Sequence, residues 1–182
     1  VGLGTHIRDV VNHVLYEDLD NLVLVGFSYG GFVVTGALAH IAERISHLVY
    51  LDAFVPNNGE SVWSHLGREA PARIELGQDW VVPGPVRNFD NPAEAAWMAA
   101  RRTTHPQGCF TEPVFLSQPL ESFPFTRTYI KASQAAENDI GNEAFWRAAR
   151  YAKGSPAWRY HEIATNHMVA NNKPEELARI LA

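Results

Sequence analysis

The sequence predicts an α/β fold, with a mostly parallel sheet flanked by helices and an inserted cap. The first observation is that short apolar runs alternate with segments of helical periodicity, the order typical of a parallel α/β sheet. The second is a Gly-x-Ser-x-Gly turn at 26–30, directly after one such run. The third is that the alternation stops after a strand ending near Phe54 and resumes with a strand starting near Thr126. The cap is expected between them.

The first part of the chain contains two helix–strand pairs. Apolar residues at helical spacing predict a helix over 5–18, with Thr5 as its cap. Residues 22–25 form an apolar, β-branched run that suits a parallel strand buried on both faces. A second helix is expected over 33–42, and a second buried strand over 47–54.

The stretch 56–123 is rich in Pro, Gly and Trp and has no clear period, except for one expected helix over 93–102. Loops of this length are uncommon within a compact domain. The sequence therefore predicts three parts: a first core segment 1–55, a cap 56–123 and a second core segment 124–182. The cap's aromatic residues predict either an apolar lid or simple packing on the sheet; they are Trp63, Trp80, Phe89, Trp97, Phe110 and Phe115.

In the second core segment the alternation returns. Strands are expected over 126–132 and 158–164, and helices over 142–153 and 174–181. Pro174 is well placed in the first turn of the closing helix.

The composition excludes several classes of function. With 182 residues the chain fits one domain with an insertion, and its net charge of −5 comes without a Lys/Arg-rich block, so no nucleic-acid partner is expected. No apolar run approaches the ~20 residues needed to span a bilayer, so no membrane partner is expected either. The single Cys109 allows no intrachain disulfide, which is compatible with a cytoplasmic protein. The candidate assembly is a homodimer.

The turn at 26–30 predicts a nucleophile elbow, because a buried strand precedes it and a helix follows it. Gly26 and Gly30 are expected to relieve crowding where the chain reverses sharply. Ser28 would then project its hydroxyl above the sheet. The backbone N–H of Tyr29, at the start of the helix, is the expected donor to an oxyanion.

A serine hydroxyl needs an adjacent base, and in this type of fold the histidine follows the final strand. His167 lies directly after the strand that ends at Ala164. The other histidines fall on helices, inside strands or in the cap, where they are expected to be surface or packing residues. His167 is therefore the predicted catalytic base.

The acid that orients His167 has two candidates. Asp52 ends an otherwise apolar strand, where a carboxylate is costly without a partner. Asp139, with Glu137 beside it, follows the strand at 126–132, where many hydrolases of this fold carry the acid. Asp52 is the predicted acid and Asp139 the alternative.

Three segments of the chain resemble the α/β-hydrolase branch that contains plant methylesterases, hydroxynitrile lyases and small bacterial esterases. They are Leu24–Gly31, Val49–Pro56, and Asn166–Met168 with Lys173 and Pro174. The resemblance covers essentially the whole chain and implies the α/β-hydrolase fold. It also implies a strand and a His-Gly-rich loop, roughly fifty residues long together, in front of Val1. That loop would supply the second oxyanion donor.

Two features depart from the plant members of that branch. They usually carry an aspartate just beyond the strand at 126–132, where this chain has none at the tip, and some related hydrolases use the position of Asp52 instead. They also commonly carry Asp before the histidine, where this chain has Asn166.

The sequence thus predicts a serine hydrolase, a carboxylesterase that cleaves small, uncharged, partly hydrophobic esters. Its expected partner is the small-molecule ester itself. No metal or organic cofactor is expected, since no Cys/His ligand cluster is visible in the sequence. Two alternatives stay open, namely a hydroxynitrile-lyase-type cleavage on the same residues and a non-catalytic small-molecule receptor.

Overall fold

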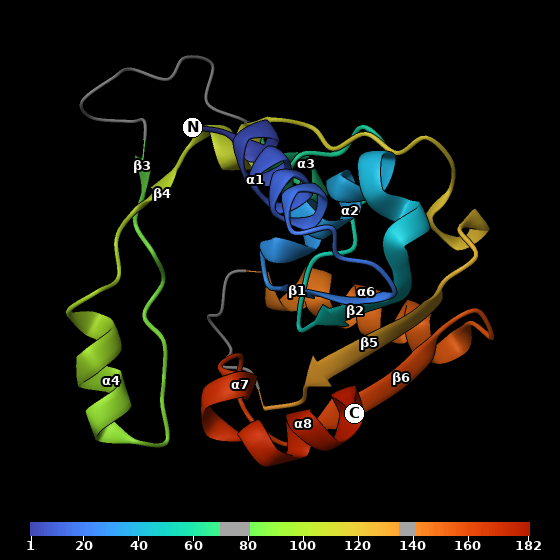
Figure 1. The fold of residues 1–182 in the computed structure, drawn as a ribbon. Helices are drawn as coiled ribbons and strands as arrows, with labels where there is room; N and C mark the ends of the chain where they lie inside the picture. The colour runs from blue at the N-terminus through green and yellow to red at the C-terminus, as the bar shows by residue number, and fades with distance from the viewer. Residues whose placement is uncertain (70–80, 135–140) are drawn as a thin grey trace.

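The computed structural model describes residues 1–69, 81–134 and 141–182. Its centre is a four-stranded sheet in the order β1-β2-β5-β6, and every neighbouring pair is parallel (Figure 1). The strands are β1 Leu22–Phe27, β2 Ile45–Leu51, β5 Thr126–Ala132 and β6 Arg159–Ile163. The predicted parallel α/β fold is confirmed.

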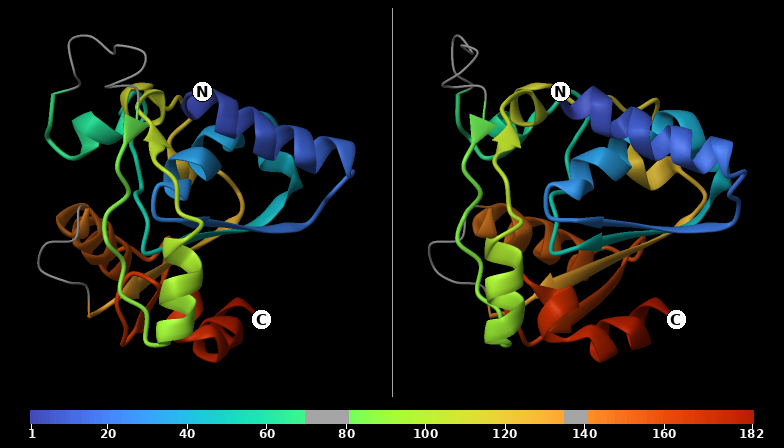
Figure 2. Two further views of the ribbon diagram at one scale, coloured as in Figure 1. Left: turned by 90° about the vertical axis from the view of Figure 1, so that its left-hand side faces the viewer. Right: turned by 60° about the vertical axis from the view of Figure 1, so that its left-hand side comes forward.

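Helices cover both faces of this sheet (Figures 1 and 2). One face packs against α1 Leu3–Tyr16, α2 Gly30–Ile41 and α6 Asn142–Gly154, which share its main apolar cluster. The other face packs against α7 Val169–Asn172 and α8 Pro174–Leu181. None of the described helices is long and apolar enough to cross a membrane.

The helix predicted over 5–18 begins earlier than its expected cap. Gly2 is the N-cap residue of α1, and Thr5 lies one turn into the helix. The Thr5 Oγ1 accepts a hydrogen bond from the Gly2 N–H at 3.3 Å. Thr5 therefore satisfies a backbone group at the helix start, but from inside the helix.

Strand β1 differs from its predicted burial on both faces. Val23 is 51% exposed, Val25 38% and Phe27 37%. Their side chains share one face of the strand, since successive residues point to opposite faces. Among the described strands β1 pairs with β2 alone, and α7 and α8 pack on β2, β5 and β6. Residues 22–25 are apolar as predicted, but the described elements cover only one side of them.

The segment between β2 and β5 holds short elements. They are α3 Val62–His65, β3 Val81–Val82, α4 Pro92–Ala99, β4 His105–Pro106, α5 Gly108–Thr111 and a 3₁₀ turn Leu120–Ser122. β3 and β4 pair antiparallel, whereas α5 packs against α1 and α3. Helix α4 buries none of its residues, and Trp97 is exposed on it. Trp80 lies outside the described residues. The assignment of 56–123 as a cap stays a prediction.

Candidate active site

The predicted site residues meet at one edge of the sheet. Strand register pairs Phe27 with Leu51 and Leu51 with Ile130, so the strands end at nearly the same level. Ser28 follows β1 directly and Asp52 follows β2 directly. Parallel strands present their carboxyl ends on the same side, which is where open α/β sheets place their sites.

The backbone at Ser28 is held in an uncommon conformation. Its φ of 55° lies in the left-handed region, as expected for a nucleophile elbow. The Ser28 N–H donates to the Leu51 carbonyl at 3.3 Å, and the Ser28 carbonyl accepts from the Phe54 N–H at 3.2 Å. These bonds tie the turn to β2 and to the chain beyond it. Hydrogen bonds to the neighbouring strand and the chain after it therefore stabilise the strained backbone conformation of Ser28.

The predicted crowding is present at one of the two elbow glycines and absent at the other. A Cβ at Gly26 would lie 2.6 Å from a methyl of Val34, so crowding does require glycine there. A Cβ at Gly30 would meet nothing within 4 Å, so the crowding argument is wrong for Gly30. It applies instead to Gly31, where a Cβ would lie 2.0 Å from the Phe54 carbonyl oxygen. The close approach of α2 to the chain after β2 therefore depends on Gly31.

A continuous hydrogen-bonded chain joins the serine, the histidine and an acid. The His167 Nε2 lies 2.9 Å from the Ser28 Oγ, and the His167 Nδ1 lies 2.7 Å from the Asp52 Oδ2. Asp52 is fully buried and His167 is 2% exposed, whereas Ser28 is partly exposed. This arrangement allows His167 to accept a proton from Ser28 while Asp52 holds the imidazole in place.

The structure thus brings Asp52 to the histidine, with a φ of 40° that its N–H bond to the Ile130 carbonyl supports. The alternative Asp139 and its neighbour Glu137 lie outside the described residues. The catalytic roles of Ser28, His167 and either acid remain predictions.

Sequence reasoning missed Lys131, which neutralises the acid. Its Nζ lies 2.7 Å from the Asp52 Oδ1 and donates also to the Ala132 carbonyl at 2.6 Å. The Lys131 side chain is completely buried, and its ammonium lies 4.6 Å from the centre of the Trp146 ring. The strand register places Lys131 beside Asp52, because Lys131 follows Ile130, the partner of Leu51. A buried carboxylate is tolerated when it is paired in this way.

Two aromatic rings contact the imidazole of His167. The Phe145 ring is stacked on His167 with centroids 5.2 Å apart and planes 4° from parallel, and the Phe27 ring lies at 4.6 Å. The loop after β6 is fixed by Asn166, whose side-chain oxygen accepts from the Met168 N–H at 3.0 Å. His167 is therefore fixed by packing and by its backbone turn.

Tyr29 has an available backbone donor beside the serine. Within the described part of the chain its N–H donates no hydrogen bond, and its role as an oxyanion donor stays a prediction. Its ring contacts Phe110 at 5.9 Å between centroids, and Phe110 in turn contacts Trp63. Burial raises the pKa of the Tyr29 phenol, with Cys109 and Glu112 acting in the same direction, so the phenol stays protonated.

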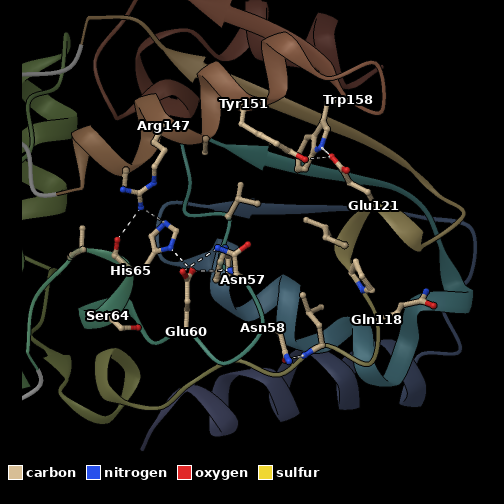
Figure 3. Close-up of a pocket in the computed structure, with 18 of the residues that line it drawn as sticks. Asn57, Asn58, Glu60, Ser64, His65, Gln118, Glu121, Arg147, Tyr151 and Trp158 are labelled. Atoms are coloured by element: carbon tan, nitrogen blue, oxygen red, sulfur yellow. Dashed lines mark hydrogen bonds and ion pairs between the residues drawn. The ribbon is translucent and has the colours of Figure 1, made fainter.

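A cavity of about 1010 Å³ lies elsewhere, between the start of the 56–123 segment and α6 (Figure 3). Neither Ser28 nor His167 lines it. On one wall the His65 Nδ1 lies 2.7 Å from the Glu60 carboxylate, and the Arg147 guanidinium donates to the His65 carbonyl at 3.0 Å (Figure 3). Size alone does not make this cavity the reaction site, since the hydrogen-bonded serine and histidine lie outside it.

Comparisons with known proteins give the same fold and family. The profile of the alpha/beta hydrolase family matches residues 2–180. A carbendazim-hydrolyzing esterase of Nocardioides sp. is 32% identical over 196 aligned residues, which cover 100% of this chain and 78% of that esterase.

Among solved structures, an extracellular alpha/beta-hydrolase from Paenibacillus matches with a TM-score of 0.78 and 19% identity, covering 100% of this chain and 78% of that one. A methylesterase from Arabidopsis matches with a TM-score of 0.70 and 19% identity, covering 99% and 76%. At these identities the structural matches show the fold, while the family profile and the Nocardioides relative show the family. The chain belongs to the alpha/beta hydrolase family.

Proposed function

We propose that this protein is a carboxylesterase that cleaves small, uncharged, partly hydrophobic esters through Ser28, His167 and Asp52. The observation that carries the proposal is the pair of hydrogen bonds on His167, at 2.9 Å to the Ser28 Oγ and 2.7 Å to the Asp52 Oδ2. A neutral imidazole that accepts from a serine hydroxyl and donates to a carboxylate is the arrangement that activates the serine.

The reaction would take two steps, acylation of Ser28 and hydrolysis of the acyl-serine. In the first, the Ser28 Oγ attacks the ester carbonyl carbon while its proton passes to the His167 Nε2. The tetrahedral oxyanion accepts a hydrogen bond from the Tyr29 N–H, and it collapses as His167 returns the proton to the departing alcohol. In the second, His167 takes a proton from water as its oxygen attacks the acyl-serine carbonyl carbon, and it returns that proton to the departing Ser28 Oγ as the carboxylic acid is released.

The surroundings of the serine support the choice of substrate. Tyr29, the residue after Ser28, contacts Phe110, which in turn contacts Trp63, and Phe27 and Phe145 contact the ring of the histidine. Such a lining favours apolar substrate groups over charged ones. The Nocardioides relative is a carbendazim-hydrolyzing esterase, which supports the same class of substrate.

A substrate panel tests the proposal. We expect p-nitrophenyl acetate and butyrate to be hydrolysed, and an ester with a carboxylate in its acyl group to react at least ~10-fold more slowly, because its charge would lose solvent at the apolar site. Carbendazim is a further probe, because the Nocardioides relative hydrolyses it. Cyanide release from mandelonitrile without ester turnover would replace the proposal by the lyase alternative. Tight binding of esters without any turnover would replace it by the receptor alternative.

A further inference from the structure

Two histidines and the only cysteine of the sequence lie close together beside the Tyr29 side chain. His6 comes from α1, His105 from β4 and Cys109 from α5. One ligand atom from each lies within 4.8 Å of the others. The cluster is invisible in the sequence, because His6 is far from the other two. We propose that His6, His105 and Cys109 form a binding site for a thiophilic divalent cation, with Zn²⁺ as the fitting ion.

The distances are close to those a tetrahedral zinc site needs. Zn–S bonds of about 2.3 Å and Zn–N bonds of about 2.0–2.1 Å place a sulfur and a nitrogen ligand roughly 3.5 Å apart. The Cys109 Sγ lies 3.7 Å from the His6 Nδ1. His105 and Cys109 are separated by three residues, a spacing within the range of short chelating loops. The ligand atoms of all three residues lie within 4.8 Å of one another, so a small contraction of the cluster would bring them to bonding distance from an ion.

His105 carries an unused ligand atom. Its Nε2 is buried and has no hydrogen-bond partner among the described residues, which is costly for a polar atom. The ring is positioned by edge-on contacts with His6 at 5.8 Å, Tyr29 at 4.6 Å and Phe110 at 4.9 Å between centroids. A cation bound at the Nε2 would satisfy this nitrogen.

One nearby carboxylate, Glu112, also favours a cation. The Glu112 carboxylate acts electrostatically on both Cys109 and Tyr29, and it is held in place by the Gly4 N–H at 2.8 Å. Imidazole and thiolate ligands together suit Zn²⁺ better than Mg²⁺ or Ca²⁺. Binding exchanges the Cys109 S–H bond for an S–Zn bond and releases one proton to solvent.

The Tyr29 hydroxyl borders the remaining coordination position. It lies 3.1 Å from the His6 Nδ1, so either this hydroxyl or a water could complete a four-ligand shell. A bound ion would link α1 of the core to β4 and α5 of the 56–123 segment. That link would stabilise the folded chain, since any ligand that binds only the folded state does so.

Cobalt gives a specific readout, because Cys109 is the only source of a thiolate. We expect Co²⁺ added to the full chain to produce a thiolate-to-cobalt charge-transfer band that saturates at one ion per chain. Cys109→Ser should abolish the band, and His105→Gln should weaken binding by at least ~100-fold through loss of a ligand. His13→Gln, an exposed histidine on the same helix as His6, should leave binding unchanged. Zn²⁺ should displace the cobalt and remove the band.

A thermal measurement separates binding from folding defects. At a hundredfold excess over its wild-type Kd, Zn²⁺ should raise the Tm of the wild type by about 5–10 °C and the Tm of His105→Gln by no more than about 2 °C. Circular dichroism in the absence of metal shows whether each variant is folded. If Cys109→Ser does not fold, the charge-transfer band of the wild type still tests the proposal. Absence of the band at saturating Co²⁺, or equal loss of binding in His13→Gln and His105→Gln, would overturn the proposal.

Discussion

The Lys131 ammonium and the Asp52 carboxylate form an ion pair of 2.7 Å in which both side chains are excluded from solvent. The other oxygen of the same carboxylate accepts from His167. While the imidazole is neutral, lysine and aspartate cancel each other's charge, and the buried group is neutral as a whole. Lys131 therefore makes it affordable to keep an ionised carboxylate at the end of β2 in the resting protein.

Replacing Lys131 by methionine should destabilise the fold. Removing one partner of a buried ion pair typically costs about 3–5 kcal/mol, because the other charge stays buried without compensation. Urea unfolding of Lys131→Met, Asp52→Asn and the double variant measures the coupling between the two groups. We expect the double variant to be more stable than the sum of the single losses predicts. Additive losses would mean that the pair contributes nothing beyond packing.

The acid is distinguished by two matched substitutions. If Asp52 orients His167, Asp52→Asn should lower kcat for p-nitrophenyl acetate by about 10⁴, since the imidazole loses its charged partner. Asp139→Asn should then change kcat by less than ~10-fold. A large loss in Asp139→Asn together with a small one in Asp52→Asn would assign the acid to Asp139. Circular dichroism confirms that both variants are folded.

Alanine substitution of two adjacent glycines in the elbow should reduce the stability by very different amounts. A Cβ at Gly31 would lie 2.0 Å from the Phe54 carbonyl oxygen, so Gly31→Ala forces backbone apart at the turn that holds Ser28. We expect a loss of several kcal/mol in stability or a failure to fold. Gly30→Ala, which meets nothing within 4 Å, should stay within about 1 kcal/mol of the wild type. Thermal unfolding of the pair decides whether α2 approaches as closely as the structure shows.

Stability should fall as the pH drops below about 6.5, the ordinary range of histidine. Burial lowers the pKa of His65, Glu60 partly opposes this and Arg147 reinforces it. The folded chain therefore binds the His65 proton only at lower pH than the unfolded chain does. Between the pKa of His65 in the folded chain and its pKa in the unfolded chain, the unfolded state binds more protons. Stability therefore rises with pH across this range, and the contribution of His65 is fully present above about 6.5.

Urea midpoints between pH 5.5 and 7.5 measure this effect. The wild type should lose stability toward pH 5.5, and His65→Gln should show a smaller slope. His161→Gln, which replaces an exposed histidine, serves as the control and should keep the wild-type slope. An unchanged slope in His65→Gln would show that the pair with Glu60 does not govern the titration.

The sequence predicts the alternation of strands and helices well, because apolar periodicity reports which faces a segment buries. It also predicts that Ser28 and His167 converge, since a glycine turn between a strand and a helix, and a histidine after the last strand, place both at one sheet edge. The cost of a lone carboxylate in an apolar strand correctly draws attention to Asp52.

Other features depend on three-dimensional neighbours that no periodicity reports. Lys131 lies in a strand whose pattern gives no sign that its ammonium is buried against Asp52. The need for glycine at Gly31 arises from a single carbonyl of a distant segment. The exposure of Val23 follows from which helices cover β1, and the joining of His6 to Cys109 follows from the packing of α1 against α5.

The most direct test of the central claim is the hydrolysis of p-nitrophenyl acetate by the wild type and by Ser28→Ala. Removal of the nucleophile should lower kcat by about 10⁴–10⁶, because the hydrogen-bonded groups act as a unit. Intact mass measured during turnover should show an acetylated protein for the wild type and none for the variant. Undiminished turnover in Ser28→Ala would contradict the proposed role of Ser28.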